Sequence, residues 1–309
     1  MLSALFLTVT LQTPRVPTLL ALERELTQVC ERFHGRIGYS LKVLKTGERI
    51  GYRENERFPT ASTIKTAVMV EAIRRVEEGK IKWTDQRPVP PMSGRQSSMW
   101  SYWFRDGIKV DLDGWVNLMI TVSDNTATMV LREWLGIDAI NARMESLGLK
   151  STKVFGPFPA SETEKFRLRG MFGLGMTTPR EMNRLLELIY LRKAASPAGC
   201  EKMLRILGRQ YWDDWIASTV PPEIKIASKT GAINRSRSDT AIVFSDNPYV
   251  LTIYTDSQVD QRWVADNEGD QAIIKIAGAV WKRLHPNRPY QQPKGWERFA
   301  PTGGGVEGG

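Results

Sequence analysis

The sequence predicts an α+β protein of two lobes, in which an antiparallel sheet flanked by terminal helices carries an inserted all-helical lobe. Three observations predict this fold class. Strand-like segments lie near both ends of the chain without intervening helices, helical periodicity dominates the middle, and a further helical segment lies towards each end. The length of 309 residues also exceeds what one small core requires.

The start of the chain predicts a leader, a helix and a hairpin. Residues 1–16 include an apolar run that is too short to span a bilayer. The run is typical of a secretory signal peptide, although the usual Lys or Arg before it is missing, and a short buried strand or helix is the alternative. Residues 16–33 carry apolar residues at helical spacing, and residues 38–44 and 49–52 read as two strands joined by a turn. We expect export, and a strand pair that begins an α/β lobe.

The middle of the chain, residues 58–205, predicts the helical lobe. The expected helices cover residues 62–79, 113–121, 125–135 and 137–147, and another begins at Thr178-Pro179. Residues 154–176 show no clear period, and so long a structureless stretch inside a compact region is usually functional. The aromatic residues of a loop at 87–106 are interpreted as core of this lobe, with an aromatic wall beside the cleft as the alternative. They are Trp100, Trp103 and Phe104.

The end of the chain predicts the remaining strands of the sheet. Three consecutive strands and then a helix are expected at residues 224–228, 240–244, 249–254 and 270–284. We therefore assign residues 17–57 and 206–296 to one discontinuous α/β lobe, and residues 297–309 to a Gly-rich disordered tail. A small-molecule site is expected in the cleft between the two lobes.

Composition and charge exclude several function classes. The net charge is +9, but acidic residues are interleaved with the basic ones and no run of five Lys or Arg occurs, which argues against a nucleic-acid partner. Neither His34 nor His285 lies near the motifs below, so no His-centred triad, metal or cofactor is expected. Cys30 and Cys200 are interpreted as buried thiols, with a disulfide in an oxidising compartment as the alternative. We expect a monomer without a stable membrane span.

Three short motifs occur in a fixed order along the chain. They are Ser62-Thr63-Ile64-Lys65, Ser123-Asp124-Asn125 and Lys229-Thr230-Gly231. Each has a plain structural explanation when taken alone, because Ser and Asp commonly cap helices and a second Lys-Thr-Gly, at 45–47, lies in the predicted hairpin turn. Ser62 begins a predicted helix, however, and the i,i+3 spacing puts Lys65 on the same face one turn later. The occurrence of all three motifs in this order is much less probable by chance than the occurrence of any one of them.

This ordered set is a documented signature of class A β-lactamases and penicillin-binding proteins. The chain resembles class A β-lactamases from about residue 19 to 284, including residues 119–127 around the second motif and Met176-Thr177-Thr178-Pro179 at the end of the Ω-loop. The resemblance implies the two-lobed serine β-lactamase/D,D-peptidase fold and a periplasmic or secreted location. It also implies a β-lactam substrate, with a role in antibiotic resistance or β-lactam catabolism.

The residue types of the motifs suit acyl transfer. Ser62 would attack an amide carbonyl to form an acyl-enzyme, and Lys65 is placed to take its proton where its surroundings keep it partly neutral. By resemblance, Ser123 passes a proton to the leaving nitrogen. The same resemblance assigns the other substrate contacts. Asn125 binds the side-chain amide, Lys229, Thr230 and Gly231 hold the carboxylate end, and the N–H groups of Ser62 and Ala232 form the oxyanion hole. Arg237 or Arg235 would assist carboxylate binding.

Removal of the acyl group depends on a residue outside the three motifs. Class A β-lactamases hold the deacylating water with an Ω-loop glutamate, and this chain offers Glu162 and Glu164, with the count back from Thr177 favouring Glu162. The family's following Asn and preceding Arg are missing, and both glutamates are equally explained as solvated loop charges. The sequence therefore predicts a β-lactamase. The alternatives are a D,D-carboxypeptidase acting on peptidoglycan stem peptides, or a slowly deacylating β-lactam-binding homologue.

Overall fold

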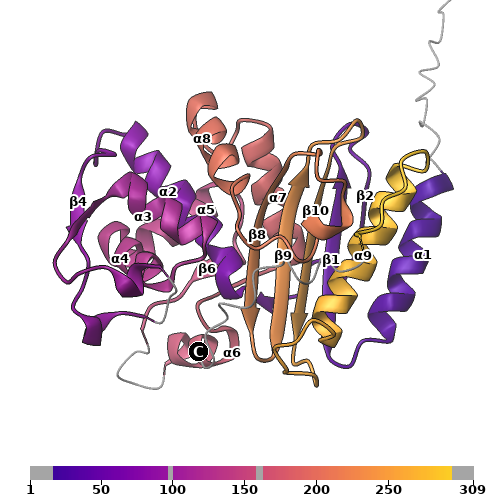
Figure 1. Ribbon diagram of the computed structural model, residues 1–309, viewed down its shortest axis with the longest axis horizontal. Helices are drawn as coiled ribbons and strands as arrows, with labels where there is room; N and C mark the ends of the chain where they lie inside the picture. The colour runs from indigo at the N-terminus through magenta and orange to yellow at the C-terminus, as the bar shows by residue number, and fades with distance from the viewer. Residues whose placement is uncertain (1–16, 97–99, 158–162, 294–309) are drawn as a thin grey trace, which may run out of the picture.

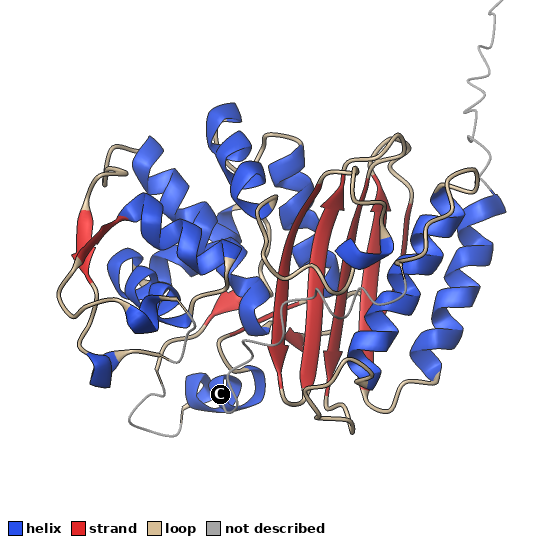
Figure 2. Cartoon of the chain, in the orientation of Figure 1, coloured by secondary structure: helices blue, strands red, loops and turns tan. Residues whose placement is uncertain are grey.

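Two lobes make up the structure, a computed structural model that describes residues 17–96, 100–157 and 163–293. One lobe holds a five-stranded antiparallel sheet with two helices on its outer face, and the other is mainly helical (Figures 1 and 2). The predicted α+β class is confirmed, and so is the pairing of strands from both ends of the chain in one sheet. The predicted leader and tail lie outside the described residues.

The sheet carries a row of polar side chains from its middle to one edge. Its strands, in spatial order, are β2 (Arg49–Tyr52), β1 (Arg36–Val43), β10 (Tyr249–Asp256), β9 (Ser236–Val243) and β8 (Ile226–Ile233). The register sets Ser40 opposite Thr252, Thr252 opposite Thr240, and Thr240 opposite Lys229. Directly paired residues point to the same face of a sheet, so this row leads to Lys229 on the strand nearest the helical lobe (Figure 1).

The terminal helices cover the other face of the sheet. They are α1 (Pro17–Glu31) and α9 (Glu268–Leu284), and they lie side by side at one end of the molecule (Figure 1). Leu22, Leu26, Ile273 and Ile276 from these helices are fully buried in one apolar cluster with the sheet. Each such side chain contributes about 1.5–3 kcal/mol when it is removed from water. The packing therefore holds the two chain ends together as one lobe.

The helical lobe is built around α2. Its helices are α2 (Lys65–Glu77), α3 (Leu112–Thr121), α4 (Asn125–Leu135), α5 (Ile137–Ser146), α6 (Glu164–Phe172) and α8 (Pro197–Leu207). Short strands complete it: β3 (Phe58–Pro59), β4 (Gln86–Pro88), β5 (Lys109–Asp111), β6 (Lys153–Val154) and β7 (Gly175–Thr177). The 3-10 turns are η1 (Ala61–Ile64), η2 (Met92–Gly94), η3 (Ser101–Trp103) and, nearer the sheet, η4 (Ala217–Thr219). The first nine residues of α2 are all buried, so this helix forms the centre of the lobe.

One further helix, α7 (Pro179–Tyr190), packs directly on the sheet. Asn183 Nδ2 donates to Ser40 O at 2.8 Å and to Val250 O at 2.9 Å, so its amide satisfies carbonyls of two strands. The predicted helical lobe, residues 58–205, includes this helix. The domain boundaries stay a prediction, and α7 is one of the elements that contact both parts.

Three local predictions need correction. The stretch at 154–176 is not structureless, because it contains α6, which is capped by Thr163 through a hydrogen bond from Phe166 N to the threonine hydroxyl. The helix α6 buries only Phe172, so the sequence shows no apolar period there. The helix α8 was not predicted, although Ser196 followed by Pro197 is a start signal. The motif at 229–231 lies inside β8 and not beyond its end, because polar residues continue the strand. Both cysteines are free and buried, as interpreted.

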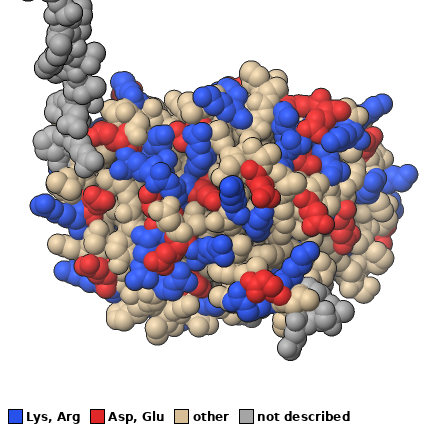
Figure 3. Space-filling model, turned by 180° about the vertical axis from the view of Figure 1, so that it is seen from behind, with Lys and Arg blue, Asp and Glu red and all other residues tan. Residues whose placement is uncertain are grey.

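The surface carries mixed charge. On the face that Figure 3 shows, Lys and Arg side chains are interspersed with Asp and Glu, which agrees with the scattered pattern in the sequence. In the part of the chain that the structure describes, no helix is both long and apolar enough to cross a membrane.

Candidate active site

The predicted nucleophile, Ser62, lies in the 3-10 turn that leads into α2. Ala61 before it has φ of +43°, which for a residue with a Cβ costs about 1–2 kcal/mol. The neighbouring threonine holds this strained turn, since Thr60 N and Oγ1 both donate to Gly175 O, at 3.0 and 2.9 Å. Thr63 Oγ1 donates back to Thr60 O at 2.8 Å. The turn thus presents Ser62, half-buried, at the positive end of the α2 dipole.

Lys65 is fully buried and joins the first motif to the second. Its Nζ donates to Ser123 O at 2.7 Å, to Ser123 Oγ at 3.1 Å and to Asn125 Oδ1 at 2.8 Å. Burial lowers the pKa of Lys65 well below its usual value, the positive charge of Lys229 lowers it further, and Asp124 opposes the shift. These surroundings favour the neutral amine of Lys65, which is the form that accepts a proton.

The second motif also contains a residue whose role the sequence did not reveal. Asp124 caps α4, since its Oδ1 accepts from Ala127 N at 2.8 Å. The same carboxylate accepts from Ser101 Oγ at 2.8 Å and Ser101 N at 2.9 Å, so it fixes the loop at η3 beside the site. Ser123 itself has φ of +59°. Asp124 is thus a positioning residue, and its position between Ser123 and Asn125 was the available signal.

The third motif brings a buried cation and a close backbone approach. Lys229 is fully buried, and its Nζ donates to Thr230 O at 3.1 Å. Burial lowers the pKa of Lys229 to about 7, against the opposing effect of Asp239. A Cβ on Gly231 would lie 2.8 Å from both Ser62 N and Thr60 O. Only glycine lets β8 approach the nucleophile turn so closely.

The structure does not bring Arg237 to the site. Its Nε lies 3.0 Å from Asp270 Oδ1, and Nη2 donates to Arg262 O at 3.0 Å. Asp270 belongs to α9, on the outer face of the sheet. The physical reason is the alternation of strand side chains, because Ser238 faces inward and donates to Thr60 O. The alternative, Arg235, pairs with Asp256 and Met171 O.

The two candidate glutamates are placed differently. Glu162 lies outside the described residues. Glu164 is the first residue of α6, 65% exposed, and its two carboxylate oxygens accept from Arg167 at 2.7 and 2.8 Å. The hydrogen bonds from Arg167 lower the pKa of Glu164, so its side chain is held as a carboxylate in a surface ion pair.

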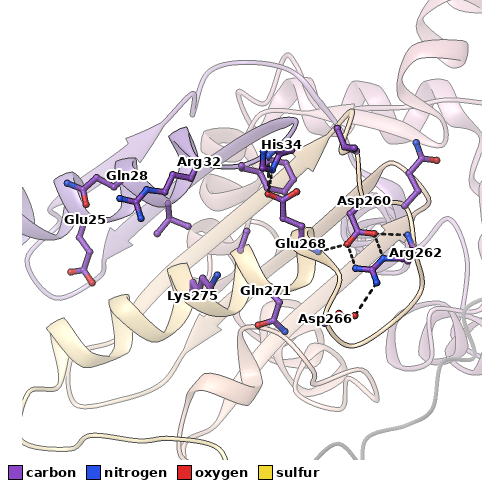
Figure 4. A pocket seen from close by; sticks show the side chains of 15 residues that line it. Glu25, Gln28, Arg32, His34, Asp260, Arg262, Asp266, Glu268, Gln271 and Lys275 are labelled. Atoms are coloured by element: carbon purple, nitrogen blue, oxygen red, sulfur yellow. Dashed lines mark hydrogen bonds and ion pairs between the residues drawn. The ribbon is translucent and has the colours of Figure 1, made fainter.

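A concave region lies away from the motifs. The hollow between α1 and α9 is lined by charged residues that pair with one another (Figure 4). His34 Nδ1 lies 2.9 Å from Glu268 Oε1, and Asp260 accepts from Arg262 at 2.9 Å. It lies on the sheet face opposite Ser62. We therefore place the chemistry at the three motifs.

The fold and the three motifs that meet in it are those of a class of serine hydrolases, in which a Ser-x-x-Lys motif leads into a helix beside the edge of an antiparallel sheet. A sequence model of the Beta-lactamase enzyme family matches residues 21–284, and the chain belongs to this family. Among curated relatives, β-lactamase PSE-4 of Pseudomonas aeruginosa is 26% identical over 84% of this chain and 88% of its own. AER-1 of Aeromonas hydrophila is 28% identical over 81% of each.

Solved structures agree with this assignment. A β-lactamase from Sphaerobacter thermophilus superposes with a TM-score of 0.76 at 25% identity, covering 87% of this chain and 99% of that one. An ancestral class A β-lactamase superposes at 0.73 with 26% identity, covering 84% and 99%. PBP-A shares the fold, with a TM-score of 0.76 at 24% identity over 87% and 97%. The resemblance to class A β-lactamases is confirmed.

Proposed function

We propose that this protein is a class A-like β-lactamase that opens β-lactam rings through an acyl-enzyme on Ser62, and that it is exported to the periplasm or secreted. The observation that carries the proposal is the position of Lys65. It is buried, its pKa is lowered, and it contacts both Ser123 and Asn125. A base near neutrality is what a serine hydroxyl needs in order to act as a nucleophile.

In the proposed acylation, Ser62 Oγ forms a bond to the β-lactam carbonyl carbon and its proton passes to neutral Lys65. The ring C–N bond then breaks, and Ser123 delivers a proton to the departing nitrogen while Lys65 restores it. The backbone N–H groups of Ser62 and Ala232 stabilise the oxyanion, a contribution of about 3 kcal/mol for each such donor. The position of Gly231 against Ser62 N supports the choice of these two donors.

We assign substrate anchoring to residues of the second and third motifs. We propose that Asn125 binds the acylamino group and that Lys229 and Thr230 bind the carboxylate. Lys229 is suited to this because a substrate anion would compensate its buried charge. Arg237 is not part of this proposal, since its guanidinium serves Asp270.

Deacylation is proposed to use Glu162 to activate the water. Glu164 is the weaker candidate because its carboxylate is exposed and bound by Arg167. A second function, D,D-carboxypeptidase or slow β-lactam binding, is favoured by one observation: no Asn follows Glu162 at the family's spacing. A solved structure with the same fold, at 23% identity, is that of a PBP-A point mutant in an acyl-enzyme complex with penicillin G.

The decisive experiment follows a chromogenic cephalosporin and the intact mass of the protein together. Wild type should turn over, Ser62→Ala should form no adduct, and Glu162→Gln should form an adduct that persists. Glu164→Gln is the matched control and should behave as wild type. A persistent adduct already in wild type, with release of D-Ala from a stem peptide, would support the second function. Absence of both turnover and an adduct in wild type would overturn both functions.

A further inference from the structure

Two exposed aromatic side chains meet beside the site, so the interpretation of Trp100 as core of the helical lobe is wrong. Trp100 is 43% exposed and Tyr211 is 41% exposed. Their ring centroids are 6.2 Å apart with an interplanar angle of 81°, and Tyr211 packs edge-on against Trp212 at 5.1 Å. The rings therefore form a corner, with apolar faces open to solvent. An open apolar corner of this kind is typical of a ligand contact.

The segment that carries Tyr211 is fixed between the second and third motifs. Tyr211 N donates to Thr121 O at 2.8 Å, and Trp212 Nε1 donates to Val122 O at 3.3 Å. Gln210 Nε2 lies 3.3 Å from Ile120 O and 3.4 Å from Ser228 O. Those carbonyls directly precede Ser123 on one side and Lys229 on the other. The segment thus bridges the two motifs at the base of the corner.

Trp100 is held from the other side of the same motif. The next residue, Ser101, is clamped by the carboxylate of Asp124 through its N and Oγ, at 2.9 and 2.8 Å. The segments that carry the two rings are thereby anchored beside Ser123, one through backbone carbonyls and the other through the carboxylate of Asp124. Rings held in place before binding lose little conformational entropy when a ligand stacks on them.

We propose that Trp100 and Tyr211 form a stacking subsite for a flat conjugated substituent on the ring that carries the substrate carboxylate. The inference rests on the proposed function, in which Lys229 and Ser123 hold that end of the substrate. The corner adjoins both residues, and an aromatic face there gains from a π-system more than from an alkyl group. The subsite makes Trp100 and Tyr211 specificity-determining residues.

Two cephalosporins with the same thienylacetamido group at C7 test the subsite. Nitrocefin carries a flat dinitrostyryl group at C3, and cephalothin carries an acetoxymethyl group. Tyr211→Ala and Trp100→Ala should each lower the second-order acylation rate with nitrocefin by about tenfold and that with cephalothin by less than about twofold. Tyr211→Phe should keep the preference. Trp103→Ala is the matched control, because Trp103 is 78% exposed on the same loop and packs on Tyr102 instead.

Equal losses with both cephalosporins in folded Tyr211→Ala, or unchanged selectivity, would overturn the subsite. Tyr211→Leu, which keeps apolar bulk without a ring, serves if the alanine variant does not fold. Equilibrium binding to Ser62→Ala separates this proposal from the proposed function. Preferential binding of nitrocefin that Tyr211→Ala removes, with no acylation in wild type, would sustain the subsite and overturn the hydrolase. Binding of neither compound would overturn both.

Discussion

Replacement of Lys229 by Met should stabilise the fold by an amount that depends strongly on pH. The pKa of Lys229 falls from 10.5 to about 7 because burial disfavours its charge. The unfolded chain therefore binds more protons than the native protein between these values, and native stability rises with pH through that range. The cost of burying the charge is about 5 kcal/mol at pH 6 and about 2 kcal/mol at pH 9.

The expected measurement is denaturant unfolding of wild type and Lys229→Met at both pH values. The difference in free energy of unfolding between the two proteins should shrink by about 3 kcal/mol on going from pH 6 to pH 9. Loss of the hydrogen bond to Thr230 O is common to both conditions and cancels. Asp239 acts in the same direction, because burial raises its pKa to about 7 and loss of the lysine charge makes its ionisation costlier above neutral pH.

The matched control is Lys275→Met at an exposed position on α9, whose effect should be the same at the two pH values. If the difference in free energy of unfolding between wild type and Lys229→Met is also the same at both pH values, burial does not lower the pKa of Lys229 and the reasoning is refuted. The variant should at the same time lose affinity for carboxylate-bearing substrates.

Three further outcomes are expected. The acylation kcat/KM should fall as the pH drops through the lowered pKa of Lys65, and again above about pH 7 as Lys229 loses its proton. A stopped-flow profile that is flat on the alkaline side would contradict this, and Lys229→Arg should keep acylation active to higher pH. Gly231→Ala should lower the free energy of unfolding by about 1–3 kcal/mol and slow acylation. Gly47→Ala in the hairpin turn should leave the acylation rate unchanged. Asp124→Ala should cost about 2–4 kcal/mol of unfolding free energy, because it removes a helix cap and both hydrogen bonds from Ser101 to the carboxylate. No loss of stability in a urea melt would count against the positioning role of Asp124.

The periodicity of the sequence predicted the elements that bury an apolar face. The hairpin at β1 and β2, the three late strands and most of the helices were predicted because their side chains alternate or recur at helical spacing. The helix α8 buries such a face and was missed all the same, and elements without one were also missed. The helix α6 buries only Phe172, and the later part of β8 carries buried polar residues, so a hydrophobicity pattern gives no signal at either.

The candidate site was predicted in part. Ser62, Lys65 and Asn125 were chosen from motif order, and the structure brings Lys65 to Ser123 and Asn125. Arg237 was named beside Arg235 as an aid to carboxylate binding. It does not reach the site, because a shift of one residue in a strand reverses the face.

By itself, the sequence determined the fold class, the family and the residue types available for acyl transfer, since these depend on periodicity and on the order of local motifs. The tertiary structure decided which side chains meet, and in what surroundings. Three properties of the site depend on segments that are far apart in sequence. They are the lowered pKa values of Lys65 and Lys229, the hydrogen bonds between Asp124 and Ser101, and the close approach of Gly231 to the turn at Ser62. Burial and long-range contact set these properties, and only packing of the complete chain produces them.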